Sequence, residues 1–182
     1  GNNGGDAFVL ARHLKQWYFN PVVVFAGDEK KLSTDAKAAF RGWRAADGGI
    51  LRTLPAPLDW GLVVDGIFGI GLDREVTGIY AEWVAAINAS HAPVLALDVP
   101  SGLQSDTGCV MGCAVRATHT VTFIALKPGL LTLDGPDHCG ELHLRTLGLD
   151  AYALRPAQGH LIGPDVLAAA LKPRTRNTHK GD

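Results

Sequence analysis

Two aspartates each follow directly on an apolar segment and precede a loop that contains glycine. Asp65 follows Leu62-Val63-Val64, and Asp98 follows Val94-Leu95-Ala96-Leu97. In open α/β sheets, ligands bind at the carboxyl ends of the strands. A single aspartate at such a place more often caps a turn or a helix. Two of them, together with the glycine-rich stretch described next, favour a shared pocket.

The first six residues, Gly-Asn-Asn-Gly-Gly-Asp, have the composition of an anion-binding loop. Glycine lets the backbone approach a ligand closely. Residues with helical spacing follow: Ala7, Leu10, Ala11, Leu14, Trp17 and Tyr18. A glycine-rich loop that opens a helix presents free backbone N–H groups and the positive end of the helix dipole, which suits phosphate. The pair Asn3-Gly4 is also typical of a β-hairpin turn, but the helical pattern after it favours the anion site.

Two further groups of residues extend this chemistry. Residues 69–74, Gly-Ile-Gly-Leu-Asp-Arg, offer a second close backbone approach, and Arg74 offers a guanidinium group for a phosphate. The alternative for Arg74 is an ordinary solvated charge. Asn3, Asp65 and Ser101 place amide, carboxylate and hydroxyl oxygens on loops at one sheet edge. Oxygens of these kinds suit a hard cation rather than zinc or copper.

The elements that position these residues are predicted from hydrophobic periodicity. Apolar runs predict buried strands at residues 22–26, 62–65, 93–98 and 120–125, with shorter strands at 50–52 and 142–144. Amphipathic patterns predict helices at 7–18, 33–46 and 79–88. Ser33 or Thr34 can cap the start of the second helix. The third is expected to face inward with Ile79, Trp83, Val84 and Ile87. Buried strands alternating with such helices predict a Rossmann-like three-layer αβα sandwich with a mostly parallel central sheet.

Composition narrows the class of protein. The chain has 182 residues, 47% of them hydrophobic, and a net charge of −1. It is long enough for one substantial core, and its charge gives no reason to expect nucleic acid or an acidic membrane as a partner. No apolar run approaches the length of a membrane span and no signal peptide is visible. Because the first residue is Gly1 rather than methionine, we expect a natural N-terminal segment to precede it.

The cysteines indicate a reducing compartment. Cys109, Cys113 and Cys139 cannot all pair within one chain, which fits the cytosol better than secretion. With His138 and His143 they offer a possible zinc set, but the C-x3-C spacing without a second clean pair is poor evidence for zinc. Plain thiols and surface histidines are the preferred interpretation.

The tail differs in composition from the rest. After Ala151 it contains three prolines, one short helix candidate at 166–171, and the basic segment Lys172-Pro173-Arg174-Thr175-Arg176. We therefore expect a domain at 1–150, followed at 151–182 by a linker or the boundary of another domain.

Four ordered motifs in residues 1–150 together resemble the NAD(P)H-hydrate epimerases, the YjeF N-terminal domain. They are residues 1–6, 65–74 and 98–103, and the set formed by 120–123, 127–130 and 140–142. Four motifs in order are far more specific than one glycine-rich loop. The family usually has glycine where this chain has Ala7, a mild change in the first turn of a helix.

The resemblance implies roles for particular residues. The hydrated nucleotide would be held by Asn2, Asn3, Gly4, Gly5, Asp6, Gly69, Ile70, Gly71, Leu72, Asp73, Arg74 and Glu75, with Asp98 reaching its altered ring. Asn3, Asp65 and Ser101 would bind a potassium ion. A homodimer is expected on the same ground.

Residues 171–174 and 179–182 carry a second resemblance, to the opening of an ADP- or ATP-dependent NAD(P)H-hydrate dehydratase domain. That domain follows the epimerase in many bifunctional chains. We therefore expect this chain to be part of a longer repair enzyme, fused to a dehydratase domain and preceded by a further helix and strand.

In hydrated NAD(P)H the altered ring carries a hydroxyl group on the carbon beside its nitrogen. Inverting that carbon needs proton transfer at the hydroxyl oxygen, and one carboxyl group with a pKa near the working pH can do this. Asp98 is the candidate acid/base because burial raises the pKa of a carboxyl. Lys127 is a second candidate, with a plain surface lysine as its alternative. Potassium would position the loop of Ser101. The competing functions are an NAD(P)-dependent oxidoreductase, for which no G-x-G-x-x-G is present, and a non-catalytic scaffold of the same fold.

Overall fold

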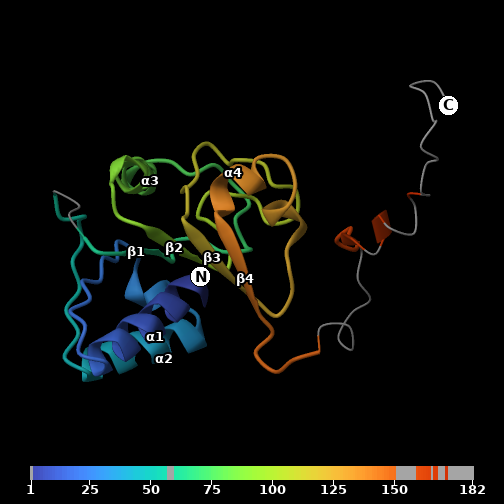
Figure 1. Ribbon diagram of the computed structural model, residues 1–182. Coiled ribbons are helices and arrows are strands. Elements are labelled where there is room, and N and C mark those ends of the chain that lie inside the picture. Colours follow the sequence, from blue (N-terminus) through green and yellow to red (C-terminus); the bar gives the residue numbers. More distant parts are fainter. Residues whose placement is uncertain (1, 57–59, 151–158, 165, 168–170, 172–182) are drawn as a thin grey trace. The chain divides into compact units, whose positions relative to one another are not determined.

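The computed structural model describes residues 2–56, 60–150, 159–164, 166–167 and 171 (Figure 1). The chain divides into two compact units, Gly1–Leu149 and Asp150–Asp182. The first unit contains the sheet and the candidate site. No helix in the described ranges is long and apolar enough to cross a membrane.

The centre of the first unit is a four-stranded parallel sheet in the order β1-β2-β3-β4. The strands are β1 (Val63–Asp65), β2 (Val94–Leu97), β3 (His119–Phe123) and β4 (Glu141–Arg145). In the register, Asp65 lies beside Ala96 and Leu97 beside Val121. The strands predicted at 62–65, 93–98, 120–125 and 142–144 are therefore confirmed, and they bring the residues after Asp65, Leu97 and Phe123 to one edge.

Helices cover both faces of this sheet. Figure 1 shows α1 (Asn2–Gln16) and α2 (Thr34–Ala45) on one side, and α3 (Ile79–Ala89) with the short α4 (Gly135–Cys139) on the other. Two 3-10 turns, η1 (Glu29–Lys31) and η2 (Pro128–Leu130), lie in the connections. The predicted three-layer α/β sandwich is confirmed. The start of α2 follows its sequence signal, since the hydroxyl of Ser33 accepts a hydrogen bond from the N–H of Ala36 at 3.3 Å.

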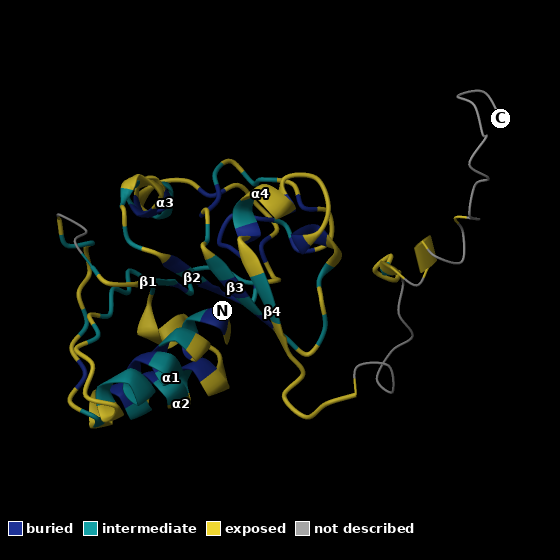
Figure 2. Ribbon diagram, viewed as in Figure 1, coloured by how far each residue is buried: buried dark blue, intermediate teal, exposed yellow. Residues whose placement is uncertain are grey.

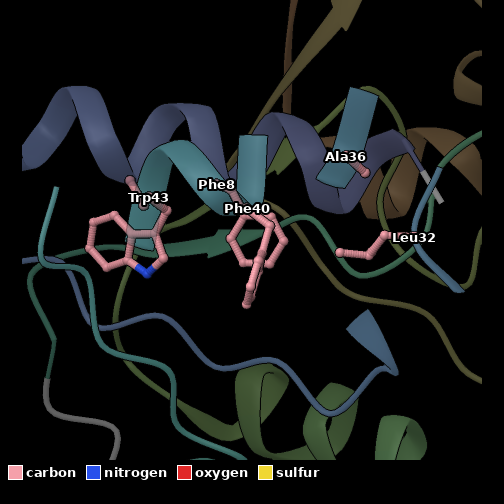
Figure 3. Close-up of a cluster of buried hydrophobic side chains, with 6 residues drawn as sticks. Phe8, Leu32, Ala36, Phe40 and Trp43 are labelled. Carbon is pink, nitrogen blue, oxygen red and sulfur yellow. The ribbon is translucent and has the colours of Figure 1, made fainter. Parts of the chain in front are cut away.

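A cluster of buried side chains, several of them aromatic, packs between α1 and α2 (Figure 3). Phe8 packs edge-to-face on Phe40 with ring centroids 5.2 Å apart, a favoured aromatic geometry. Trp43 is buried beside them and donates its indole N–H to the carbonyl of Gly49 at 2.9 Å. A second cluster, which includes Val84, lies under α3. Burial is concentrated in these clusters, along β2 and at alternate residues of β3, whereas β4 has no buried residue (Figure 2).

Three predictions of local structure are wrong. Residues 2–6 lie in the first turns of α1 rather than in a loop before it, because Gly5 packs on Ala36 of α2 and tertiary packing outweighs the poor helix propensity of glycine. The segment 22–26 is half-buried and has only a bridge between Val24 and Leu51 among the described residues, so neither it nor 50–52 forms a strand. A strand requires a pairing partner along its length.

The inward faces of two helices also differ from expectation. Helix α1 ends at Gln16, and Trp17 and Tyr18 beyond it are 63% and 98% exposed. Ile79 at the start of α3 is 37% exposed, whereas Trp83, Val84 and Ile87 are buried as predicted.

The second unit has less described structure. Pro164, Val166 and Leu167 are helical, and the N–H of Leu171 donates to the carbonyl of Leu167. The rest of the predicted helix at 166–171, the proposed linker at 151–158 and the dehydratase-like residues 172–182 lie outside the described residues.

Candidate functional site

Asp65 ends β1 as a buried carboxylate, with 1% of its surface exposed. One oxygen accepts the hydroxyl of Ser101 at 2.5 Å and the N–H of Ile67 at 3.2 Å, and the other accepts the N–H of Ser101 at 2.7 Å. Burial raises the pKa of Asp65 above its ordinary value, and these hydrogen bonds offset only part of that effect. The carboxylate thereby fixes the loop after β2 to the end of β1.

The backbone of Phe68 links the other two predicted cation ligands, Asn3 and Ser101, beside this carboxylate. Its N–H donates to the hydroxyl oxygen of Ser101 at 2.8 Å, and its carbonyl accepts the amide nitrogen of Asn3 at 2.7 Å. Asn3, Asp65 and Ser101 therefore lie together, as predicted, although they are far apart in the sequence.

The side-chain oxygen of Asn3 has an unusual environment. It is buried and has no hydrogen-bond partner among the described residues. The orientation of the amide is fixed, because only its nitrogen can donate to the carbonyl of Phe68. An unpaired buried amide oxygen costs free energy, and a hard cation would satisfy it together with the oxygens of Asp65 and Ser101. The donor set therefore fits a cation such as potassium.

Asp98 forms an ion pair with Lys127 directly after β2. The ammonium group of Lys127 also donates to the hydroxyl of Thr122 at 2.9 Å and to the carbonyl of Phe123 at 2.8 Å. The side chains of Asp98 and Lys127 are only 15% and 17% exposed. Lys127 is thus not a plain surface lysine, and that alternative is wrong.

The backbone of Asp98 has the left-handed conformation, with φ at 66°. Aspartate tolerates this region better than most residues, but it remains uncommon outside glycine. The side-chain oxygen that faces Lys127 also accepts the N–H of Phe123 at 3.3 Å. The position of Asp98 is therefore fixed both by its turn and by contacts to the end of β3.

Asp6 is a second carboxyl group at this place. Partial burial of the group raises its pKa, and the charge of Asp98 raises it further. Asp6 therefore lies close enough to Asp98 to respond to its charge. The sequence assigned Asp6 only to nucleotide binding, and its closeness to Asp98 was missed; its position one turn into the helix after Asn2-Asn3 was the available signal.

Of the other α1 residues assigned to the nucleotide, some pack against α2 and others remain accessible. Gly5 is buried, and a Cβ there would lie 3.0 Å from the Cα of Ala36. The side chain of Asn2 accepts the hydroxyl of Ser33 at 2.6 Å. Gly4 remains open at the first turn, where helical N–H groups have no intrahelical partner. Free N–H groups at a helix start are suited to an anion.

The loop at residues 69–75 lies beside Asn3. A Cβ on Gly69 would approach the Cβ of Asn3 to 3.1 Å, so this position requires a close backbone approach. Leu72 is buried with the cluster under α3, which leaves only its backbone to contact a ligand. Asp73, Arg74 and Glu75 are exposed and form no hydrogen bond or ion pair within the described part of the chain. Ile70 and Gly71 are also exposed.

The cysteines do not form the zinc set considered above. Cys109 is exposed, Cys113 is half-buried, and Cys139 is buried, with burial raising the pKa of its thiol to about 11. In the described ranges, the side chains that do approach one another with metal-ligand spacing are His119, Glu141 and His143.

The parallel sheet flanked by helices defines an α/β domain, and its oxygen cluster lies at the carboxyl ends of the strands, where such folds bind ligands. Residues 1–129 match the family model described as "YjeF-related protein N-terminus", and the chain belongs to this family. An NAD(P)H-hydrate epimerase of Levilactobacillus brevis is 39% identical over 151 residues, covering 83% of this chain and 70% of the relative. One of Bordetella bronchiseptica is 41% identical over 163 residues, covering 87% and 71%.

Longer relatives also match. The bifunctional NAD(P)H-hydrate repair enzyme Nnr of Escherichia coli is 38% identical over 184 aligned positions, covering 100% of this chain and 36% of the relative. The chain thus spans about a third of that relative's length, and 28% of the similar enzyme of Leishmania braziliensis. The crystal structure of yeast ynu0 superposes with a TM-score of 0.60 at 25% identity, covering 71% of this chain and 56% of that one.

Proposed function

We propose that this domain is an NAD(P)H-hydrate epimerase, which interconverts the R and S forms of hydrated NADH or NADPH. The proposal rests first on the relatives of similar length that carry this name, of which the chain covers about 70%. It is supported by a site in which Asn3, Asp65, Asp98 and Ser101 all lie at one sheet edge. A scaffold that had lost the activity would have no need to retain them all.

The reaction inverts a carbon that carries a hydroxyl group and adjoins the ring nitrogen. In the route we favour, a base takes the hydroxyl proton, the carbon–nitrogen bond breaks to give an aldehyde, and the ring nitrogen gains a proton. Closure from the opposite face reverses these transfers and gives the other epimer. Each direction needs one group that accepts a proton and one that delivers it.

The two carboxyl groups of the site divide this work. Asp98, which is paired with the cation of Lys127, acts as the base at the hydroxyl oxygen. We assign delivery of the proton to Asp6, a solvent-exposed carboxyl whose pKa is raised by partial burial and by the charge of Asp98. Two neighbouring carboxyl groups in different environments are a common acid/base arrangement.

The cation is also part of the proposal. Asn3, Asp65 and Ser101 would hold a potassium ion, which supplies fixed positive charge that orders the two loops without taking part in bond breaking. The first-turn N–H groups of α1 and the exposed guanidinium of Arg74 would bind phosphate groups of the nucleotide. Residues 2–6 and 69–75 are the corresponding binding segments.

We further propose that the domain is fused to a dehydratase domain in a longer cytoplasmic protein and that it forms a homodimer. The bifunctional relatives support the fusion. Light scattering on the full-length protein measures the oligomeric state, and a monomeric mass would refute the dimer.

The epimerase proposal is tested with the full-length protein and a nucleotide hydrate enriched in one epimer. Chromatography follows the approach to the equilibrium mixture, with a protein-free sample as the control for spontaneous interconversion. We expect acceleration in potassium and less of it in lithium. Asp98→Asn should abolish the acceleration while binding of the nucleotide is retained. A rate equal to that of the protein-free sample would overturn the proposal, and an unchanged Asp98→Asn variant would remove Asp98 from the mechanism.

A further inference from the structure

A second polar cluster lies on β3 and β4, away from the candidate site. The ring nitrogens of His119 and His143 are 3.2 Å apart. One oxygen of Glu141 lies 3.7 Å from the His119 nitrogen, and the other lies 3.6 Å from the His143 nitrogen. One ligand atom from each of the three side chains can therefore be chosen within 4.8 Å of the others.

The sheet register explains why these side chains meet. His119 lies directly beside Glu141, and Val121 lies beside His143. Residues two apart on a strand share a face, so all three side chains are on one side of the sheet. The opposite side is occupied by Thr120 and Thr122, which are buried. The backbone positions of the three side chains are thus fixed by two paired strands (Figure 1).

We propose that His119, Glu141 and His143 form a binding site for one divalent transition-metal ion of the zinc type. Imidazole and carboxylate groups are common ligands for zinc. Zinc bonds of about 2.0–2.1 Å at tetrahedral angles place neighbouring ligand atoms about 3.3–3.4 Å apart. The nitrogen–nitrogen spacing of 3.2 Å differs from this by only a tenth or two of an ångström. The nitrogen–oxygen spacings of 3.7 and 3.6 Å are also close to it, and each belongs to a different oxygen of Glu141.

Three protein ligands leave a fourth position of a tetrahedral ion to water or to another molecule. The cluster is open to solvent on that side, because the side chains of His119, Glu141 and His143 are 45%, 68% and 30% exposed. An ion can therefore enter without any rearrangement of the fold.

The site is separate from the epimerase site. Asp98 contacts Phe123 at the carboxyl end of β3, whereas His119 begins that strand. Four residues of strand separate these positions by about 13 Å along the strand. Loss of zinc binding would therefore leave the proposed epimerase function untouched.

The alternative is a histidine pair that shares one proton and is balanced by Glu141. It needs no metal, because one ring nitrogen can donate to the other. The two interpretations differ in whether both nitrogens bind a single ion at once.

The test is zinc titration of the tag-free full-length protein against a chromophoric chelator. The exposed thiol of Cys109 is replaced by serine in every sample so that it cannot compete. We expect the Cys109→Ser protein to bind one more zinc ion per chain than the same protein carrying His143→Ala. Loss of a residue that only hydrogen-bonds a metal ligand already lowers metal affinity by about 10–100-fold. Removal of a ligand itself should therefore lower the affinity by at least about a hundredfold. Glu141→Gln should weaken binding in the same direction, and His91→Ala, an exposed histidine outside the cluster, is the matched control.

A second readout does not depend on the variants being folded. Long-range ¹H–¹⁵N spectra of the histidine rings should show zinc-dependent shifts at Nδ1 of His119 and Nε2 of His143, with none at His91. Unshifted rings, or an affinity that His143→Ala leaves equal to that of the His91→Ala control, would overturn the proposal.

Discussion

Replacing Ser101 by alanine tests the oxygen cluster through stability. The hydroxyl of Ser101 donates to Asp65 at 2.5 Å and accepts the N–H of Phe68 at 2.8 Å, and both Ser101 and Asp65 are 1% exposed. A hydrogen bond to a charged group contributes about 1.5–3 kcal/mol, and a buried N–H left without a partner costs about 1–3 kcal/mol. We therefore expect Ser101→Ala to lower the free energy of unfolding by about 3–5 kcal/mol.

Ser105→Ala is the matched control for this change. Ser105 lies in the same loop region and is 5% exposed, but its hydroxyl has one contact, at 3.4 Å, to the carbonyl of Ile70. So long a contact is weak, and its loss should cost less than about 1 kcal/mol. Urea unfolding, followed by circular dichroism at matched ionic strength, measures both variants. Equal destabilisation by the two substitutions would refute the assigned role of the Ser101 hydroxyl.

The same samples test the cation. If potassium binds only the folded protein, its stabilisation grows as RT ln(1 + [K⁺]/Kd). The parent should be more stable in potassium than in lithium, and Ser101→Ala should lose that difference because one ligand is gone. A parent with no preference between the two ions would refute the cation site while leaving the hydrogen-bond argument intact.

Three other changes probe the remaining parts of the site. Lys127→Met should lower kcat by at least about tenfold with a smaller effect on KM, because Asp98 loses the ion pair that fixes its position; steady-state kinetics measures both. Asp6→Asn should remove a pH dependence: a raised carboxyl pKa stabilises the fold below the ordinary value of 3.8, and that contribution is lost as pH rises through the folded value, so unfolding midpoints above 3.8 should vary less with pH in the variant. Gly69→Ala should weaken the response to potassium, because its Cβ would press on the adjacent asparagine at 3.1 Å, whereas Gly71→Ala meets nothing within 4 Å and should behave as the parent in the same unfolding assay.

The sheet edge was predictable because its signals are local. Parallel strands buried on both faces appear as continuous apolar runs, and Asp65 and Asp98 follow two such runs directly. Since parallel strands end at a common edge, the meeting of Asp65 with Ser101 also follows from the order of elements. The start of α2 at Ser33 is local in the same sense.

Features that depend on tertiary partners could not be predicted. The segment 22–26 has the composition of a strand, but within the described part of the chain it pairs only through Val24, and composition does not specify a partner. The pairing of Lys127 with Asp98 spans 29 residues and depends on the turn after β3. His119 and Glu141 meet only because the register of β3 and β4 sets them side by side. A shift of that register by one residue would place them on opposite faces.

The proposed cation ligand Ser101 and the carboxylate of Asp98 lie on one tight turn, so their positions are linked. Val99 is fully buried between Asp98 and Ser101, the N–H of Val99 bonds to the carbonyl of Leu97 at 2.9 Å, and the carbonyl of Ser101 accepts the N–H of Val115 at 2.8 Å. A turn held at both ends transmits a displacement of Ser101 to Asp98, because packed interiors have little room to absorb it. Loss of the cation should therefore reduce kcat through the position of Asp98, even though the ion contacts no reacting atom. A potassium effect confined to KM would contradict this coupling and would place the ion at the nucleotide-binding step instead.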